Sequence, residues 1–152
     1  IWIKGPNVFS AYWRMPEASA ASFKDEWFCT GDMGYLDPDG FLYITDRKMD
    51  MYISGGENVY PAEVERILSN YPLVAEVAVI GVADDKWGEV GVAVIHPKDA
   101  DGSFSEDAFF AFCKDNLAGY KRPRKIIISK EPLPKTPTGK LVKKDLRQLL
   151  DR

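Results

Sequence analysis

The sequence has few of the residues that metal and thiol chemistry need. Among 152 residues it has two cysteines, Cys29 and Cys113, and one histidine, His96. The cysteines form no C-x-x-C pair, so we expect neither a zinc site, nor any other metal site on these residues, nor a Cys–His catalytic pair. Both cysteines are interpreted as packing residues in a reducing compartment.

Long apolar runs and a large excess of one charge are also missing. No apolar run approaches the ~20 residues that span a bilayer, and no signal-peptide pattern opens the sequence. A formal net charge of -3 argues against general binding to nucleic acids or membrane surfaces, although residues 121–125 (KRPRK) are locally cationic. We therefore predict a cytoplasmic protein with no nucleic-acid partner and no membrane span.

The chain reads as a piece of something longer. It opens without methionine, inside a strand-like apolar run (IWIKG). Residues 1–46 then carry short apolar runs separated by turn residues such as Gly5-Pro6 and the stretch DPDG at 37–40, which predicts small antiparallel strands. A piece of that size buries too little apolar surface to fold alone.

From residue 51 the pattern predicts a compact unit that alternates strands and helices. MYIS and ENVY flank Gly55-Gly56 as a hairpin, and Pro61 opens an amphipathic helix. Ser105 caps a second helix, with Gly119 as its stop. Three buried strands and a closing helix complete the unit: Val74–Val82, Val90–Ile95, Lys125–Ser129, and a helix whose apolar residues are Leu146, Leu149 and Leu150. The fold class is α+β, a three-stranded sheet flanked by helices plus a β-hairpin, preceded by a short β-rich segment.

The sequence LPKTPTGKLVKKDL, residues 133–146, places Lys140 at the tip of a Pro/Thr/Gly loop. A phosphate-binding G-x-x-x-x-G-K-[ST] loop is excluded, because Pro134 stands where the first glycine belongs and Leu141 where the magnesium-binding hydroxyl belongs. By itself the loop is better explained as a solvated turn whose lysine faces water.

Four stretches in order carry a resemblance to a known family. They are residues 30–65 (TGDMGYLDPDGFLYITDRKMDMYISGGENVYPAEVE), VIGVADDKWGE, YKRPRK, and PLPKTPTGKLVKKDLR at 132–147. Together they resemble the C-terminal third of the AMP-forming acyl-CoA synthetases in the adenylate-forming superfamily. The resemblance implies that residues 1–48 end a large N-terminal adenylating domain and that residues 49–152 form a mobile C-terminal lid.

The resemblance also implies an activity and a first set of site residues. Such enzymes activate a carboxylic acid with ATP to an acyl-adenylate and pass the acyl group to CoA, with Mg²⁺ bound mainly by the large domain. Lys140 is expected to stabilise charge that develops at the α-phosphate. Asp32 of TGD is expected to bind the ribose hydroxyls of ATP or AMP, and Arg47 to reach the same region. A turn role for Asp32, and an Arg47 ion pair with Asp46 or Asp50, remain open alternatives.

The implied hinge and CoA site complete the set. Met49 stands at the pivot, where the family usually has Asp or Lys; a hinge needs backbone freedom more than charge. Gly55 and Gly56 are expected to let the pantetheine arm pass, although a plain hairpin turn also explains them. The remaining CoA candidates are Trp87, which packing explains equally well, Tyr120, Arg122 and Arg124.

Two other functions stay open. One is an adenylation-domain fragment that serves a carrier protein, and the other is a non-catalytic module that binds CoA or a nucleotide. We expect this chain alone to be inactive, because the phosphate-binding loop and the acid pocket of the family lie in the N-terminal domain. The acid and the oligomeric state are not predicted.

Overall fold

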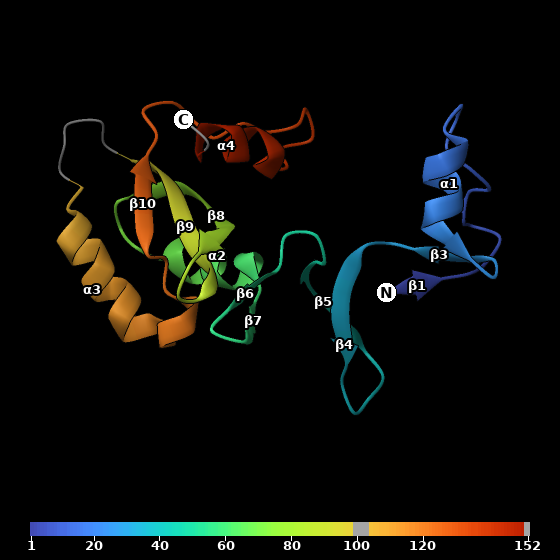
Figure 1. Cartoon of the computed structure of the whole chain (residues 1–152), viewed down its shortest axis with the longest axis horizontal. Coiled ribbons are helices and arrows are strands. Elements are labelled where there is room, and N and C mark those ends of the chain that lie inside the picture. The colour runs from blue at the N-terminus through green and yellow to red at the C-terminus, as the bar shows by residue number, and fades with distance from the viewer. Residues whose placement is uncertain (99–103, 151–152) are drawn as a thin grey trace. The chain divides into compact units, whose positions relative to one another are not determined.

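The computed structural model describes residues 1–98 and 104–150, with side chains as far as Arg147. The chain divides into two compact units, Ile1–Met49 and Asp50–Arg152 (Figure 1). Each is described by itself below. No helix within the described residues is long and apolar enough to cross a membrane.

The first unit consists of short antiparallel strands, as predicted, plus one helix that the sequence analysis missed. β1 (Trp2–Ile3), β3 (Trp27–Cys29) and β2 (Phe23–Lys24) form one small sheet in that order. β4 (Asp32–Leu36) and β5 (Leu42–Arg47) form a separate hairpin. The missed helix is α1 (Pro16–Ser22), which a proline in its first turn and the alanine-rich sequence PEASAAS favour.

Side-chain burial in this unit is slight. None of its residues is fully buried, and its best-packed part is an aromatic cluster of Phe9, Tyr12, Phe23 and Phe28. Large apolar side chains such as Trp13, Leu36 and Phe41 remain more than 60% exposed, at 84%, 66% and 67%. This agrees with the expectation that so small a piece lacks a core of its own.

The second unit is built on one sheet. The predicted strands are present as β8 (Val74–Asp84), β9 (Gly88–Pro97) and β10 (Lys125–Ile128); β8 is antiparallel and β10 parallel to β9. The predicted hairpin, β6 (Tyr52–Ser54) and β7 (Glu57–Val59), joins the sheet where Ser54 pairs with Gly88. β10 is less buried than predicted: it lies at the sheet edge, and Lys125 and Ile128 are exposed.

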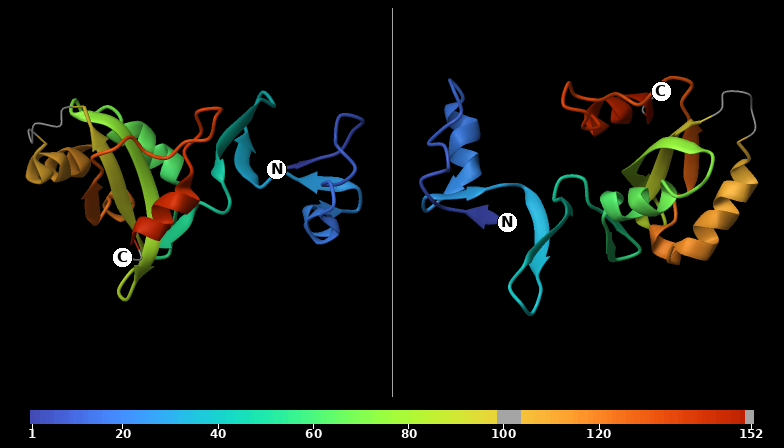
Figure 2. Two further views of the ribbon diagram at one scale, coloured as in Figure 1. Left: turned by 90° about the horizontal axis from the view of Figure 1, so that it is seen from above. Right: turned by 180° about the vertical axis from the view of Figure 1, so that it is seen from behind.

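Both faces of this sheet are covered, because successive β8 side chains alternate between two apolar clusters. Val77 and Val79 belong to the larger cluster, together with residues of α2 (Pro61–Leu68) and α3 (Glu106–Asn116). Ala78 and Ile80 belong to the other cluster, together with residues that include Leu146 of α4 (Lys143–Leu150). Figure 2 shows the helices around the sheet from two further sides. The side chains of Leu149 and Leu150, which the sequence analysis placed on the closing helix, lie outside the described part.

The helix termini follow local chemistry in two of three cases. Pro61 lies in the first turn of α2, and the Ser105 hydroxyl accepts a hydrogen bond from the Ala108 amide at 3.3 Å, as a capping serine should. The prediction that Gly119 ends α3 was wrong. The helix ends at Asn116, and Gly119 instead begins the 3₁₀ turn η1 (Gly119–Lys121).

Candidate functional site

Asp32 and Arg47, the two nucleotide-binding candidates, lie side by side in the first unit. They are paired across β4 and β5, and Arg47 Nε lies 3.4 Å from Asp32 Oδ1. The structure pairs the Arg47 side chain with Asp32 rather than with the alternative partner Asp50. Asp50 instead pairs with Arg147 at 3.1 Å, and Asp46 accepts the Arg47 backbone amide.

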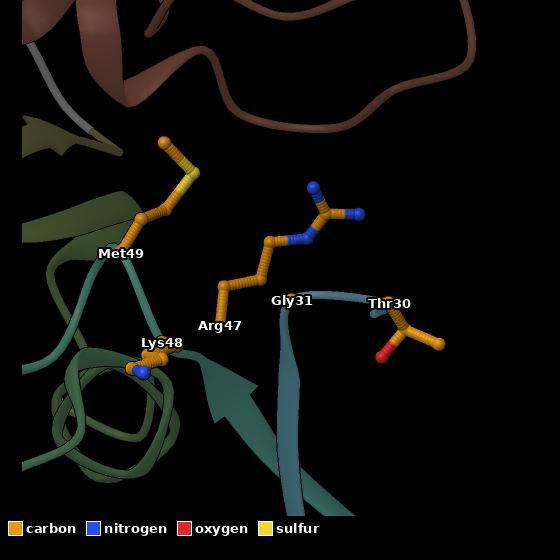
Figure 3. Close-up of a pocket in the computed structure, with 5 residues that line it drawn as sticks. All are labelled: Thr30, Gly31, Arg47, Lys48 and Met49. Atoms are coloured by element: carbon orange, nitrogen blue, oxygen red, sulfur yellow. The ribbon is translucent and has the colours of Figure 1, made fainter. Parts of the chain in front are cut away.

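A surface pocket of about 500 Å³ adjoins this pair, lined by Thr30, Gly31, Arg47, Lys48 and Met49 (Figure 3). The Thr30 hydroxyl accepts the Asp32 amide at 3.0 Å, and Gly31, with a φ of 76°, accepts the Lys48 amide at 2.8 Å. These bonds fix the TGD turn against the end of β5. A half-exposed carboxylate and two cationic side chains suit a ligand with hydroxyl and anionic groups. The sequence analysis did not single out Thr30 or Lys48.

Lys140 lies on a hydrogen-bonded hairpin in the second unit. Thr136 and Gly139 close the turn: the Gly139 amide donates to the Thr136 carbonyl at 2.9 Å, and the Thr136 amide donates to the Lys140 carbonyl at 2.8 Å. The Thr136 hydroxyl also accepts the Lys140 amide at 3.1 Å. Gly139 has a φ of 83°, which favours glycine. The Lys140 side chain is exposed and has no ion pair among the described residues.

Three of the CoA candidates come together although they are far apart in the sequence. The Gly55 amide donates to the Trp87 carbonyl at 2.8 Å, and a Cβ on Gly55 would lie 2.7 Å from the Trp87 ring. Arg124 lies over the same ring, 5.0 Å from its centroid, as a cation–π contact. Gly56 completes the turn with open space around its Cα. We call Gly55, Trp87 and Arg124 the tryptophan cluster.

Tyr120 and Arg122 have other surroundings. Tyr120 packs against the larger apolar cluster. The Arg122 guanidinium donates to the Leu117 carbonyl at 2.8 Å and the Lys114 carbonyl at 3.0 Å, so it caps the C-terminus of α3. Arg122 therefore has a clear structural role in the second unit. Its CoA role, and that of Tyr120, remain predictions.

Lys121, which the sequence analysis did not name as a site residue, forms an ion pair. Its ammonium bonds to Glu63 of α2 at 2.6 Å, and this hydrogen bond raises the pKa of Lys121. The pair ties η1 to the helix. Of the cationic run at 121–125, Arg124 is the one whose side chain lies in the tryptophan cluster.

Neither buried titratable group of the second unit suits nucleophilic chemistry. Burial raises the pKa of Cys113 to about 11, which keeps the thiol protonated at neutral pH, as expected for a packing residue. Burial also raises the pKa of Tyr52, whose hydroxyl has no hydrogen-bond partner among the described residues. Among the described residues no group of three or more His, Cys, Asp and Glu side chains could hold a metal.

Comparison with known families accounts for this arrangement. The model of the AMP-binding enzyme C-terminal domain matches residues 63–140, just over half of the chain. The chain belongs to this family. The match begins in α2 and ends at Lys140, so it contains Trp87, Arg122 and Arg124 as well.

Individual curated proteins show which members of the family this chain is similar to. The 2-succinylbenzoate--CoA ligase of Listeria monocytogenes serovar 1/2a is 49% identical over 148 residues, which are 97% of this chain and 31% of the relative. The chain thus spans about a third of the length of such curated relatives. It is similar to the C-terminal portion of adenylate-forming acyl-CoA ligases.

Solved structures agree. The o-succinylbenzoate CoA synthetase of Bacillus subtilis, in complex with its acyl-adenylate intermediate, is 44% identical with a TM-score of 0.85 over 96% of this chain and 29% of that one. The same enzyme has been solved with ATP and magnesium ion. A fatty acyl CoA synthetase of Mycobacterium tuberculosis is 46% identical with a TM-score of 0.67, over 97% of this chain and 29% of that one.

Proposed function

We propose that the full-length protein is an AMP-forming acid–thiol ligase that converts 2-succinylbenzoate to its CoA thioester. The carboxylate oxygen attacks the α-phosphorus of ATP and pyrophosphate leaves; the CoA thiolate then attacks the acyl carbon and AMP leaves. The ligase class rests on the family. The acid rests on the relatives' names, because the acid pocket of the family lies outside this part of the chain.

One observation carries the catalytic role of this portion: Lys140 is exposed without an ion-pair partner on a hydrogen-bonded hairpin. A cation held this way is available to a phosphate and needs little reorganisation to reach it. We assign Lys140 to the first half-reaction, where it stabilises negative charge on the oxygens around the α-phosphorus.

The other site residues divide between the two substrates that carry a nucleotide. The Asp32 carboxylate accepts hydrogen bonds from the ribose hydroxyls of ATP. Arg47, whose Nε lies 3.4 Å from Asp32 Oδ1, lines the pocket beside this carboxylate. The tryptophan cluster serves CoA in the second half-reaction, with the Arg124 guanidinium available to phosphate and the Trp87 ring to stacking. The glycine turn leaves room beside it for the pantetheine arm.

The test uses full-length protein with Lys140→Ala. We expect acyl-adenylate formation from ATP and 2-succinylbenzoate, followed by pyrophosphate release, to fall by about two to three orders of magnitude, the scale of losing one preorganised charge donor. Transfer from a supplied acyl-adenylate to CoA should persist. A fatty acid serves as the competing substrate, since a fatty acyl CoA synthetase is also similar.

Four results would contradict the proposal or a part of it. Adenylation within twofold of wild type would leave Lys140 a surface residue. Preference for the fatty acid would change the proposed substrate but leave the proposed adenylation and thioester-forming steps in place. Adenylate formation without any CoA thioester would favour an acceptor other than CoA, such as a carrier protein, and absence of both half-reactions in wild type would favour a non-catalytic module.

A further inference from the structure

The hairpin that presents Lys140 is fastened to the second unit by a carboxylate on each side. The residues before the turn meet Glu76 of β8: its Oε2 accepts the Leu133 amide at 2.8 Å, and its Oε1 bonds to the Lys135 ammonium. These bonds hold the pKa of Glu76 below the usual glutamate range, chiefly through Lys135 and against the opposing effect of partial burial. Glu76 is therefore charged and bound to the loop at neutral pH.

The residues after the turn meet Glu65 of α2. Its Oε1 accepts the Val79 amide of β8 and the Lys143 ammonium, both at 2.7 Å. Lys143 is the first residue of α4, and the two paired side chains are only 17% and 12% exposed for Glu65 and Lys143. Glu65 thus joins helix α2, strand β8 and the start of α4 through one carboxylate.

Apolar contacts fix the same two ends. Leu133, just before Lys135, is 3% exposed, and Leu146, three residues after Lys143, is fully buried. Both pack in the smaller apolar cluster beneath the hairpin. Between them the amide of Val142 donates to the Pro134 carbonyl at 2.8 Å, which closes the base of the hairpin. The tip alone, with Lys140, projects from this support.

The charges follow a pattern along this segment. Lys135 and Lys143 each form an ion pair with a carboxylate, whereas Lys140 between them has no ion pair among the described residues. A carboxylate left without its own lysine would attract the nearest mobile ammonium. The flanking lysines therefore do two things: they fix the hairpin and they satisfy the carboxylates that Lys140 could otherwise bind.

We propose that Glu76–Lys135 and Glu65–Lys143 form a carboxylate clamp that positions Lys140 for adenylation. The four residues are positioning residues, because none is assigned contact with the substrate. The inference rests on the proposed role of Lys140. The more exposed pair, Glu76–Lys135, should contribute little to stability, whereas a misplacement of about 1 Å can cost up to about a hundredfold in rate, so loss of this pair should be visible in catalysis before it is visible in stability.

The test replaces the lysines, because this leaves the bonds from Glu76 to the Leu133 amide and from Glu65 to the Val79 amide in place. In full-length protein, Lys135→Met and Lys143→Met should each lower the rate constant of adenylation by about tenfold. The KM for ATP, the transfer of supplied acyl-adenylate to CoA, and the Tm of Lys135→Met should stay near wild type. Lys135→Arg, which keeps the charge, should restore most of the rate.

Two further variants complete the design. Lys130→Met is the matched control: this exposed lysine lies just outside the hairpin, has no ion pair among the described residues and should change nothing. Amide hydrogen exchange gives a readout that does not depend on activity. Exchange of the Thr136 and Val142 amides should rise in Lys135→Met and stay unchanged in Lys130→Met.

The outcomes separate the clamp from the proposed function. If Lys140→Ala abolishes adenylation but both methionine variants stay within twofold of wild type, the clamp is overturned and the role of Lys140 stands. Equal loss in both half-reactions together with a lower Tm overturns it as well, since the pairs would then support only the fold. If Lys140→Ala itself has no effect, the proposed function fails first.

Discussion

Arg122 and Arg124 are two residues apart, yet their guanidinium groups lie in different surroundings. Arg122 donates to two carbonyl oxygens at the end of α3, at 2.8 Å and 3.0 Å. Arg124 is exposed and lies over the Trp87 ring. The two side chains thus have different contacts although a single residue, Pro123, separates them in the sequence. The sequence treats them as one cationic run, but their contacts assign them separate tasks.

Single substitutions should separate these tasks. Arg122→Ala should lower the free energy of unfolding by about 1 to 2 kcal/mol, because the carbonyls it caps lose a charged donor. Arg124→Ala should leave stability near wild type and raise the KM for CoA by about tenfold, or ~1.4 kcal/mol of phosphate binding. Urea unfolding and the CoA dependence of thioester formation measure the two effects. The assignment fails if Arg122→Ala weakens CoA binding without changing stability.

At the scale of elements, the β6–β7 hairpin links the sheet to the tryptophan cluster. Its two-residue turn has φ values of 60° at Gly55 and 86° at Gly56, as a type I′ turn requires. The surroundings of the two glycines differ. A Cβ on Gly55 would press on Trp87, whereas a Cβ on Gly56 would meet nothing within 4 Å. The turn therefore does more than reverse the chain: it also makes space for an aromatic ring from the β8–β9 connection.

The two glycines offer a matched pair of variants. Gly55→Ala and Gly56→Ala both place alanine at positive φ, which costs roughly 1 kcal/mol each. Gly55→Ala should cost about 1 to 2 kcal/mol more, because it also overpacks against Trp87. Urea unfolding gives both values. If the glycine pair passes the pantetheine arm, the KM for CoA rises in both variants, and the excess in Gly55→Ala is the part due to the ring. Equal stability of the two variants would contradict the contact.

For the whole molecule, the division into two units falls directly after Met49. The Met49 side chain is 74% exposed, so packing does not explain its presence there. The nucleotide candidates Asp32 and Arg47 belong to the first unit, whereas Lys140 and the tryptophan cluster belong to the second. A rotation about Met49 would change which part of the second unit serves the nucleotide side. The hinge itself remains a prediction.

Met49→Pro tests it. Proline fixes φ near -65° and also restricts Lys48, so a hinge that must sample two backbone states would be held in one. We expect one half-reaction to fall by at least about tenfold more than the other, measured separately as pyrophosphate release and as transfer of supplied acyl-adenylate to CoA. Met49→Ala, which keeps the backbone free, is the control and should retain both. Equal losses in both half-reactions of a folded Met49→Pro variant would exclude a hinge at this position.

The sequence by itself determined the features that depend on neighbouring residues. The Gly55-Gly56 hairpin, the start of α2 at Pro61 and the Ser105 cap follow from turn and capping chemistry within a few positions. Short apolar runs predicted β8 and β9 for the same reason. Sequence motifs also named the family, because their order and spacing are preserved along the chain.

Only the tertiary structure decided which distant groups meet. Gly55, Trp87 and Arg124 form one cluster because β6 and the β8–β9 connection are brought together in one sheet, and no local pattern encodes that pairing. The contacts of Arg122 with the carbonyls at the end of α3 were also decided by the tertiary structure. So were the contacts of the two carboxylates that hold the Lys140 hairpin. A long charged side chain has many candidate partners in the sequence. Strand register and helix packing select among these partners, because they fix which carbonyl or carboxylate lies within reach of the side chain.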